Sequence, residues 1–562
     1  MRKADAFAAA ARPQYRLAAD RLDLQECDLD NAARIIGEYG PDMLYVTGKG
    51  WGVWDGSRFS FRSGDLRAME IGAKLRALVN AEAEAWWTAE IDDQTAWKRV
   101  EAEIKKAKPA FADPDGARTA IRRENFARLK RHALKCGNAG KIKSALELAE
   151  HQVRVEIEAL DSDPWIFLCP NGAVDLRAAR DADFTAAEDD EILKMRRKWI
   201  KPADRASFPT RCAGVDYDPA ATCPEWQGFV DLIFPDAAVR ACFHRAMGML
   251  LFGRNDEQVA LLFRGPGGNG KSTATQAIAS VMGENDGYTA SCKIEMFIVT
   301  PQTGAGQATP EEVDIPGARV MIASEPAATD ELSAKKIKAM TGGDRRPARA
   351  LGKEQFYYRP QAVPILSFNR TPRIKDEDEG TRRRLIFFPF EVNLRALPPE
   401  KRRNPSEFEA VLKSERAGIL NWMLDGWREY CRLGLAPTEA MQTLKADVME
   451  RADPVGEFLA DCCDTEPGAK IKVADAYASY VEWCNRTGAT EYRKSGFAGL
   501  VQEKGYRKKK TDGGNWFYTG LRWRDSPGVR DLLTACNIIV DWRDNALTDD
   551  DDNAMDHEPP PF

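Results

Sequence analysis

The sequence predicts an α/β core that lies between a mixed α+β N-terminal region and a small C-terminal domain of helices and a hairpin. Residues 258 to about 393 alternate apolar strands with helical or turn segments, which is the pattern of an α/β sheet. Within this stretch a glycine-rich run, residues 264–273 (RGPGGNGKST), connects a buried strand to a helix. Residues 66–160 favour long helices, and residues 473–523 favour two helices followed by a hairpin.

At 562 residues the chain is too long for one ordinary core. Composition changes along the chain, and we expect a region boundary at each change. The six expected regions are a mixed α+β N-terminal region at 1–165, strands and helices at 166–250, the α/β core at 251–400, a helical connector at 401–450, a helix-and-hairpin domain at 451–525, and a C-terminal segment with an acidic tail at 526–562.

Bulk composition is that of a globular protein, with 43% hydrophobic and 30% charged residues. The formal net charge of −6 gives no global sign of nucleic-acid binding, so such a partner has to be inferred from local basic clusters. The twelve cysteines include no CxxC pair, which favours reduced thiols over zinc. No stretch approaches the roughly 18 apolar residues of a membrane span, and the N-terminal alanine run is too short for a signal peptide. We therefore expect a cytoplasmic location and no membrane partner.

The regions upstream of the glycine-rich run combine strands and helices. Residues 51–56 (WGVWDG) are typical of a hairpin. From residue 164 the run DPWIFLCPNGAVDLR alternates apolar stretches with Asn-Gly and Pro, which indicates strands and tight turns. Residues 226–251 form an expected helical stretch that leads into the core.

The glycine-rich run matches the phosphate-loop pattern GxxxxGK[ST] and has the strand before it and the helix after it that this pattern requires. Glycines let backbone N–H groups converge on phosphates at a helix N-terminus, where the dipole favours anions. We expect ATP here, with the Lys271 ammonium neutralising the β and γ phosphates and the Ser272 hydroxyl binding Mg²⁺. The expected ATP ligands are the loop residues and the first residues of the helix: Gly265, Gly267, Gly268, Asn269, Gly270, Lys271, Ser272 and Thr273.

Two further strands of the core end in polar residues that suit ATP hydrolysis. The strand at 318–325 ends in Glu325, whose carboxylate would polarise the attacking water and contact the metal, although a solvent-facing Glu is an equally good interpretation of that strand alone. The strand AVPILSFN ends in Asn369, whose amide can position the water and sense the γ phosphate. Arg383 and Arg384 follow in a basic turn, which is either simply solvated or donates an arginine to the ATP of a neighbouring subunit.

Two basic stretches are candidates for contact with DNA phosphates. Residues 345–359 predict a hairpin with Lys353 at its tip and Arg349 behind it; an incidental lysine on a surface hairpin is the alternative. The second stretch comprises Arg507, Lys508, Lys509 and Lys510 before a Gly-Gly turn, preceded by an expected helix at 495–504. This arrangement resembles the wing of a winged helix, and a solvated charge run is the alternative.

The order of the motifs along the chain resembles that of a known family. The glycine-rich loop, MIASE, IKAMTGGD, PILSFNRTP and RRRLIFFPF follow one another over about 120 residues. In that order they resemble superfamily 3 helicases, specifically the phage, plasmid and poxvirus primase-helicase branch. The segments GWGVWDGSRF, NGAVDL and GVDYDPAATCPEWQGFVDLIF upstream, and VADAYASYVEWC downstream, also look like that branch. Together they cover most of residues 40–525.

The resemblance implies an AAA+-like P-loop ATPase core of superfamily 3 type with a C-terminal winged helix. It implies a hexameric ring that translocates on single-stranded DNA and parts forked DNA during replication, with ATP and Mg²⁺ as cofactors. Glu325 would be the catalytic carboxylate, Asn369 the sensor, and Arg383 or Arg384 the finger that acts on the neighbouring subunit, while the hairpin with Lys353 would line the pore. Ser324 precedes Glu325 where many members carry two adjacent acids, which leaves a second carboxylate ligand unassigned.

Primase activity is not expected. Polymerising chemistry needs clustered metal-binding carboxylates with a His, or a zinc module, and none of the four histidines lies beside a DxD-like motif. The alternative to a replicative helicase is a P-loop ATPase that acts as a DNA-binding initiator, loader or defence scaffold without unwinding.

The last fourteen residues, DDDDNAMDHEPPPF, are too acidic to pack into a core. The acidic tract, the prolines and the terminal Phe562 resemble the tips of bacterial single-stranded DNA-binding proteins, which replication enzymes capture. Host replication proteins are therefore candidate partners. A tail that only improves solubility, or one that folds back and competes with DNA, is the alternative.

Overall fold

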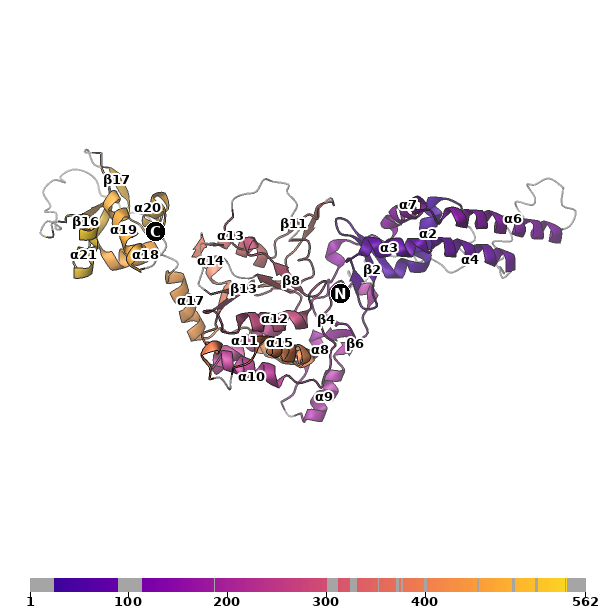
Figure 1. Ribbon diagram of the computed structural model, residues 1–562, viewed down its shortest axis with the longest axis horizontal. Coiled ribbons are helices and arrows are strands. Elements are labelled where there is room, and N and C mark those ends of the chain that lie inside the picture. The colour runs from indigo at the N-terminus through magenta and orange to yellow at the C-terminus, as the bar shows by residue number, and fades with distance from the viewer. Residues whose placement is uncertain are drawn as a thin grey trace, which may run out of the picture. The chain divides into compact units, whose positions relative to one another are not determined.

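The computed structural model describes residues 25–88, 114–185, 187–300, 312–323, 331–351, 353–369, 373–375, 378–398, 402–451, 454–487, 491–510, 514–540 and 542. The chain forms two compact units, Met1–Met441 and Gln442–Phe562. Figure 1 shows their helices and strands, and each unit is described by itself.

The N-terminal part of the first unit packs helices around a small antiparallel sheet with strand order β1-β2-β3. Its strands are β1 (Met43–Val46), β2 (Gly50–Trp54) and β3 (Phe59–Ser60), and its helices are α2 (Asp28–Tyr39), α3 (Gly64–Ala73), α4 (Leu75–Thr88), α6 (Pro114–Lys135) and α7 (Ala139–Ala149). Inside this core the Arg34 guanidinium pairs with the Glu82 carboxylate at 2.7 Å, with both side chains almost fully buried. The hairpin expected at residues 51–56 corresponds to β2 and the turn that follows it.

A second small sheet, with strand order β4-β5-β6, leads towards the core. Its elements are β4 (Ile166–Cys169), β5 (Gly172–Asp175), α8 (Leu176–Asp181), α9 (Asp189–Arg197) and β6 (Ile200–Lys201). The expected helical stretch at 226–251 is two helices, α10 (Pro224–Ile233) and α11 (Ala237–Met249). The break has a local cause, because Pro235 disfavours helix at the residue before it and the Asp236 carboxylate caps α11 by accepting from the N–H of Ala238 and of Val239.

The centre of the first unit is a parallel five-stranded sheet with the order β15-β7-β13-β9-β8. These strands are β7 (Ala260–Arg264), β8 (Thr289–Cys292), β9 (Val320–Ala323), β13 (Val363–Phe368) and β15 (Leu385–Pro389). In Figure 1, α12 (Lys271–Met282) lies on one side of this sheet and α13 (Ala334–Thr341) on the other. The predicted α/β core is thereby confirmed.

Shorter elements complete the first unit. Strand β10 (Glu331–Ser333) pairs in parallel with β14 (Arg373–Lys375), and β11 (Arg346–Ala348) pairs with β12 (Phe356–Tyr358) as an antiparallel hairpin. The remaining helices are α14 (Glu379–Arg382), α15 (Pro405–Ser414) and α16 (Arg416–Leu433), and the short 3-10 turns include η3 (Glu150–Gln152), η4 (Ile157–Ala159) and η8 (Leu394–Ala396). Helix α16 packs against α11, and its buried side chains belong to the same core as the sheet.

The second unit has its own core of aromatic side chains, including Phe458, Tyr480, Phe497 and Tyr518. It follows α17 (Glu439–Arg451), which crosses the division between the units. Its elements in chain order are α18 (Pro454–Cys462), β16 (Cys463–Lys472), α19 (Val473–Thr487), α20 (Lys494–Glu503), β17 (Lys508–Lys510), β18 (Trp516–Trp523) and α21 (Pro527–Ala535), with the sheet order β16-β18-β17.

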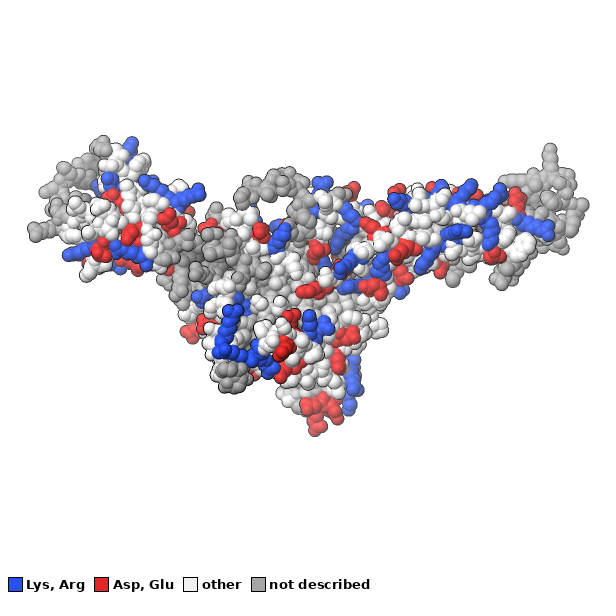
Figure 2. Space-filling model, in the orientation of Figure 1, with Lys and Arg blue, Asp and Glu red and all other residues white. Residues whose placement is uncertain are grey.

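Across the described ranges, no helix combines the length and the apolar character needed to cross a membrane. Acidic and basic side chains are interspersed over the face that Figure 2 shows, in keeping with a net charge close to balance. The acidic tail and its terminal Phe562 lie outside the described residues.

Candidate functional site

The glycine-rich loop runs from the end of β7 to the start of α12. Gly268 and Gly270 have φ angles of +83° and +87°, a region that side-chain-bearing residues rarely adopt. A Cβ on Gly265 would lie 1.9 Å from the carbonyl oxygen of Phe390, so that position has no room for a side chain. The shape of the loop therefore requires glycine at 265, 268 and 270.

Lys271 is the first residue of α12, and its side chain folds back over the loop. The residue is 4% exposed, and its ammonium donates to the Gly265 carbonyl at 2.5 Å and to the Asn269 amide oxygen at 3.0 Å. It also donates to the amide oxygen of Asn369 at 2.9 Å. The structure thus brings Lys271 and Asn369 together, because β7 and β13 are parallel neighbours and their carboxyl ends meet at one edge of the sheet.

The start of α12 has the features of an anion site. Gly270 is its N-cap and contributes no side-chain hydrogen bond, so no side chain of the cap satisfies the N–H groups of the first turn. Ser272 is exposed there and Thr273 is half-buried, while no atom lies within 4 Å of a Cβ built on Gly267. An exposed hydroxyl beside a buried ammonium and a glycine-rich loop fits a polyphosphate with a Mg²⁺ ion.

Asn269 ties this loop to the segment after β15. Its side-chain amide, 2% exposed, donates to the carbonyl oxygen of Phe390. Further along, the N–H of Leu394 donates to the Gly268 carbonyl at 3.0 Å, and a Cβ on Gly268 would lie 2.9 Å from Nε of Arg395. The sequence does not predict Arg395, because nothing in the residues around it indicates a place beside the loop.

The short helix α14 fixes the start of the arginine turn. The Asp378 carboxylate caps it by accepting from the N–H and the hydroxyl of Thr381, both at 2.8 Å, and it pairs with the Lys338 ammonium of α13. These hydrogen bonds, that from Lys338 first, lower the pKa of Asp378 to about 2. The turn that follows is therefore anchored to α13.

The two arginines of this turn differ in their surroundings. The Arg384 guanidinium donates to the Gln258 side chain at 2.6 Å, to the Gly380 carbonyl at 2.9 Å and to the Thr341 hydroxyl at 3.2 Å. Burial, and then the neighbouring Arg383 charge, lower its pKa. Arg383 is exposed. Of the two, Arg384 joins separate elements of this chain, whereas Arg383 faces solvent.

Glu325 lies outside the described residues, as does Ser324. The strand that leads to them is described: β9 ends at Ala323 and pairs in parallel with β13. Its carboxyl end therefore points to the same edge of the sheet as the glycine-rich loop.

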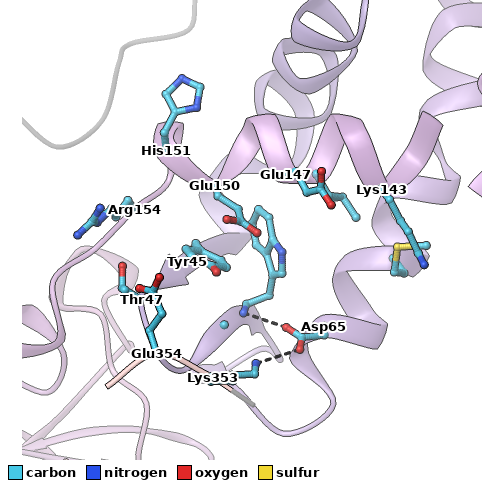
Figure 3. Close-up of a pocket in the computed structure, with 15 residues that line it drawn as sticks. Tyr45, Thr47, Asp65, Lys143, Glu147, Glu150, His151, Arg154, Lys353 and Glu354 are labelled. Atoms are coloured by element: carbon cyan, nitrogen blue, oxygen red, sulfur yellow. Dashed lines mark hydrogen bonds and ion pairs between the residues drawn. The ribbon is translucent and has the colours of Figure 1, made fainter. Parts of the chain in front are cut away.

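The predicted DNA-binding hairpin is present as β11 and β12. At its tip, Nζ of Lys353 donates to the Lys49 carbonyl at 2.9 Å. It also donates to the Asp65 carboxylate at 3.1 Å, as Figure 3 shows. Arg349 is exposed, and its Nε donates to the Lys353 carbonyl at 3.2 Å. The lysine expected to meet DNA is engaged here by the N-terminal part of the same chain.

The second basic stretch forms strand β17 and the residue before it. Arg507, Lys509 and Lys510 are exposed, and the half-buried Lys508 places its ammonium 5.6 Å from the centre of the Trp516 ring. Trp516, on the paired strand β18, is 47% exposed. Positive charge and an accessible aromatic ring thus share one edge of the second unit.

The described residues include no cluster of three or more His, Cys, Asp or Glu side chains that could hold a metal ion. Ser272 and the undescribed Glu325 remain the predicted metal ligands of the nucleotide site.

Three family descriptions match separate parts of the chain. "D5 N terminal like" matches residues 32–235, "Family of unknown function (DUF5906)" matches residues 263–384, and "Poxvirus D5 protein-like" matches residues 450–519. The second of these extends from the end of β7 through the glycine-rich loop to Arg384. The two D5 matches support a D5-type primase-helicase family.

Proteins of large DNA viruses are similar over half of the chain or more. One from Acanthamoeba polyphaga mimivirus, named "Putative helicase", is 28% identical over 349 residues, which are 58% of this chain and 34% of that protein. Another of the same name from Frog virus 3 is 27% identical over 316 residues, 53% of this chain and 32% of that protein. The chain thus spans about a third of the length of these relatives.

Among solved structures, the apo form of the NrS-1 C-terminal region is 12% identical and aligns over 55% of this chain and 77% of that one. The TM-score is 0.32, and a likeness of that size carries no argument about fold or function.

Proposed function

We propose that this chain is an ATP-dependent DNA helicase with an AAA+-like core of superfamily 3 type, which acts in the replication of a phage or another mobile genetic element. The observation that carries the proposal is the contact between Lys271 and Asn369 at the carboxyl ends of adjacent parallel strands. A lysine that can bind phosphates and a polar side chain that can position water are parts that ATP hydrolysis uses. The names of the viral relatives support the same interpretation.

The nucleotide site would hold ATP and Mg²⁺, which together supply the phosphoanhydride bond and charge neutralisation at the reacting phosphate. Lys271 and the loop amides would bind the phosphates, and Ser272 would bind the metal. Glu325 would polarise the attacking water and contact the metal. The Asn369 amide oxygen accepts from the Lys271 ammonium in the structure. With ATP bound, this amide would instead bond to the γ phosphate or to the attacking water.

Arg383 is the finger that completes the site of a neighbouring subunit in a hexameric ring. The exposure of Arg383 and the three internal bonds of Arg384 support this assignment. An arginine already engaged in its own subunit would have to give up those bonds to act elsewhere.

DNA contacts come from two places. The hairpin of β11 and β12 would face a single strand in the pore through Lys353 and Arg349. The second unit would act as a winged helix that binds the fork through Arg507 to Lys510. Its order of helix, strand, two helices and a pair of antiparallel strands supports this assignment. Such contacts bind DNA phosphates and give the protein little preference for a base sequence.

Mass measurement and DNA-stimulated hydrolysis on the purified full chain test this proposal together. With ATP, Mg²⁺ and single-stranded DNA, the expected species has about six times the 62.6 kDa of the chain, and its turnover rises when DNA is added. A single chain that hydrolyses ATP at the same rate with and without DNA would contradict the ring.

A further inference from the structure

The tip of the hairpin is held by the N-terminal part of the first unit. Lys353 donates to the Asp65 carboxylate on α3 and to the backbone carbonyl of Lys49 in the turn between β1 and β2. The same Asp65 also accepts from the N–H of Trp51 at 3.2 Å, which orients its carboxylate towards the hairpin. Figure 3 marks the bond between the Lys353 ammonium and the Asp65 carboxylate.

Glycines let the turn approach the hairpin closely. A Cβ on Gly50 would lie 2.5 Å from Nζ of Lys353 and 2.8 Å from the Asp65 carboxylate. A Cβ on Gly48 would lie 2.8 Å from the Glu354 carbonyl oxygen, and both glycines have positive φ. The turn is therefore shaped to receive the hairpin tip, which an incidental surface contact would not require.

A second ion pair holds the base of the hairpin in the same way. The Arg345 guanidinium, just before β11, pairs with the Glu158 carboxylate of η4 in the N-terminal part. Two basic residues of the hairpin thus face two acidic residues from outside the core. DNA phosphates would bind the same two basic groups. The two carboxylates therefore occupy the positions that phosphates would take.

The ion pair between Lys353 and Asp65 is exposed, so another anion can replace the carboxylate. The Lys353 and Asp65 side chains are 37% and 64% exposed, so solvent screens the pair and its strength is modest. The pair lies at the edge of a cavity of about 660 Å³, which Glu147 and Glu150 also line. Because the Lys353 side chain is partly exposed, a phosphate can reach its ammonium from solvent.

We propose that Asp65 is an internal competitor of DNA, which holds Lys353 until a strand enters and its phosphate takes the place of the carboxylate. This inference rests on the proposed DNA-binding role of the hairpin. Under this inference the N-terminal part lowers the affinity of the chain for single-stranded DNA. The alternative is that its contact only orders the hairpin.

The test is Asp65→Asn in the full chain, with affinity for a fluorescent single-stranded oligonucleotide measured by anisotropy without nucleotide. The change removes the charge and keeps an oxygen that can accept from the Trp51 N–H, so the fold is preserved. Competition predicts an affinity about two- to fivefold higher, the size expected for losing one exposed ion pair. A lower affinity would mean that Asp65 orders the hairpin for DNA, and an unchanged affinity would mean that it does not compete; either result overturns the proposal.

Two comparisons make the result specific. Glu147→Gln removes a negative charge from the same cavity without touching Lys353, and an equal rise in affinity there would show a general charge effect and overturn the proposal. In the Lys353→Ala background, Asp65→Asn should change nothing, and a persisting rise would also refute competition for that lysine. If Lys353→Ala leaves DNA affinity unchanged in both backgrounds, the hairpin itself does not bind DNA and the proposed function fails at that point. If Lys353→Ala binds the oligonucleotide more weakly but Asp65→Asn does not bind it more tightly, competition by Asp65 is refuted. The DNA-binding role of the hairpin then still stands.

Discussion

Replacing Asn369 with alanine removes a side chain that links the tip of β13 to Lys271 of the glycine-rich loop. In the structure its amide oxygen accepts from the Lys271 ammonium at 2.9 Å. A hydrogen bond to a charged group contributes about 1.5–3 kcal/mol. If Asn369 makes a bond of this kind to the reacting phosphate or its water only in the transition state, its loss lowers kcat by about ten- to a hundredfold, at roughly 1.4 kcal/mol per factor of ten.

Binding of ATP should change much less. The Lys271 ammonium keeps its bonds to the Gly265 carbonyl and the Asn269 amide oxygen, and the loop N–H groups do not depend on Asn369. We therefore expect the Kd for a fluorescent ATP analogue to stay within about threefold, because those ground-state contacts remain. Steady-state phosphate release and nucleotide titration give the two numbers.

Ser367→Ala is the matched control, since it alters the same strand two residues earlier. It should leave both numbers near those of the parent chain. Turnover within about twofold of the parent in Asn369→Ala would refute the sensor role. A parallel fall in nucleotide affinity and thermal stability would instead mean that Asn369 only orders the loop.

Three further predictions concern the nucleotide site and a fourth the basic strand. Glu325→Gln should leave nucleotide binding largely intact and stop hydrolysis, because the carboxylate acts on the water and the loop holds the phosphates; retained turnover would point to another carboxylate. Arg383→Ala protein should regain part of its activity when mixed with Lys271→Ala protein, since each supplies what the other lacks across a subunit interface, and no recovery would contradict a finger acting in trans. Arg384→Ala should instead lower the melting temperature, because it breaks three internal hydrogen bonds, and an unchanged melting temperature would contradict that role. Neutralising residues 507–510 should weaken fork binding and flatten its dependence on salt, by a slope of about 0.7–0.9 for each DNA phosphate that the protein no longer neutralises; an unchanged slope would remove this strand from the DNA interface.

Local sequence predicted the central elements well. The helix expected after the glycine-rich loop is found at Lys271–Met282, where a glycine N-cap starts it and Gly283 ends it. Asn369 was expected at a strand tip and lies directly after β13. That its amide would meet Lys271 depends on the order of strands in the sheet, which no local pattern states.

Other parts of the site could not be predicted because they depend on contacts between distant segments. Arg383 and Arg384 are adjacent and chemically identical, and only partners on other elements distinguish them. Arg395 lies beside the loop because the chain after β15 runs along it. The basic tip of the hairpin was recognised from its charge, whereas its pairing with Asp65 arises from the packing of the N-terminal part against the hairpin.

We propose that ATP hydrolysis at the loop of Lys271 drives the separation of DNA strands. The decisive measurement is the unwinding of a forked duplex with a labelled strand, with the intact chain and its Lys271→Ala variant compared in ATP and in ADP. We expect strand separation only for the intact chain in ATP. Hydrolysis by the intact chain without separation of the fork, or separation by Lys271→Ala at an equal rate, would contradict it.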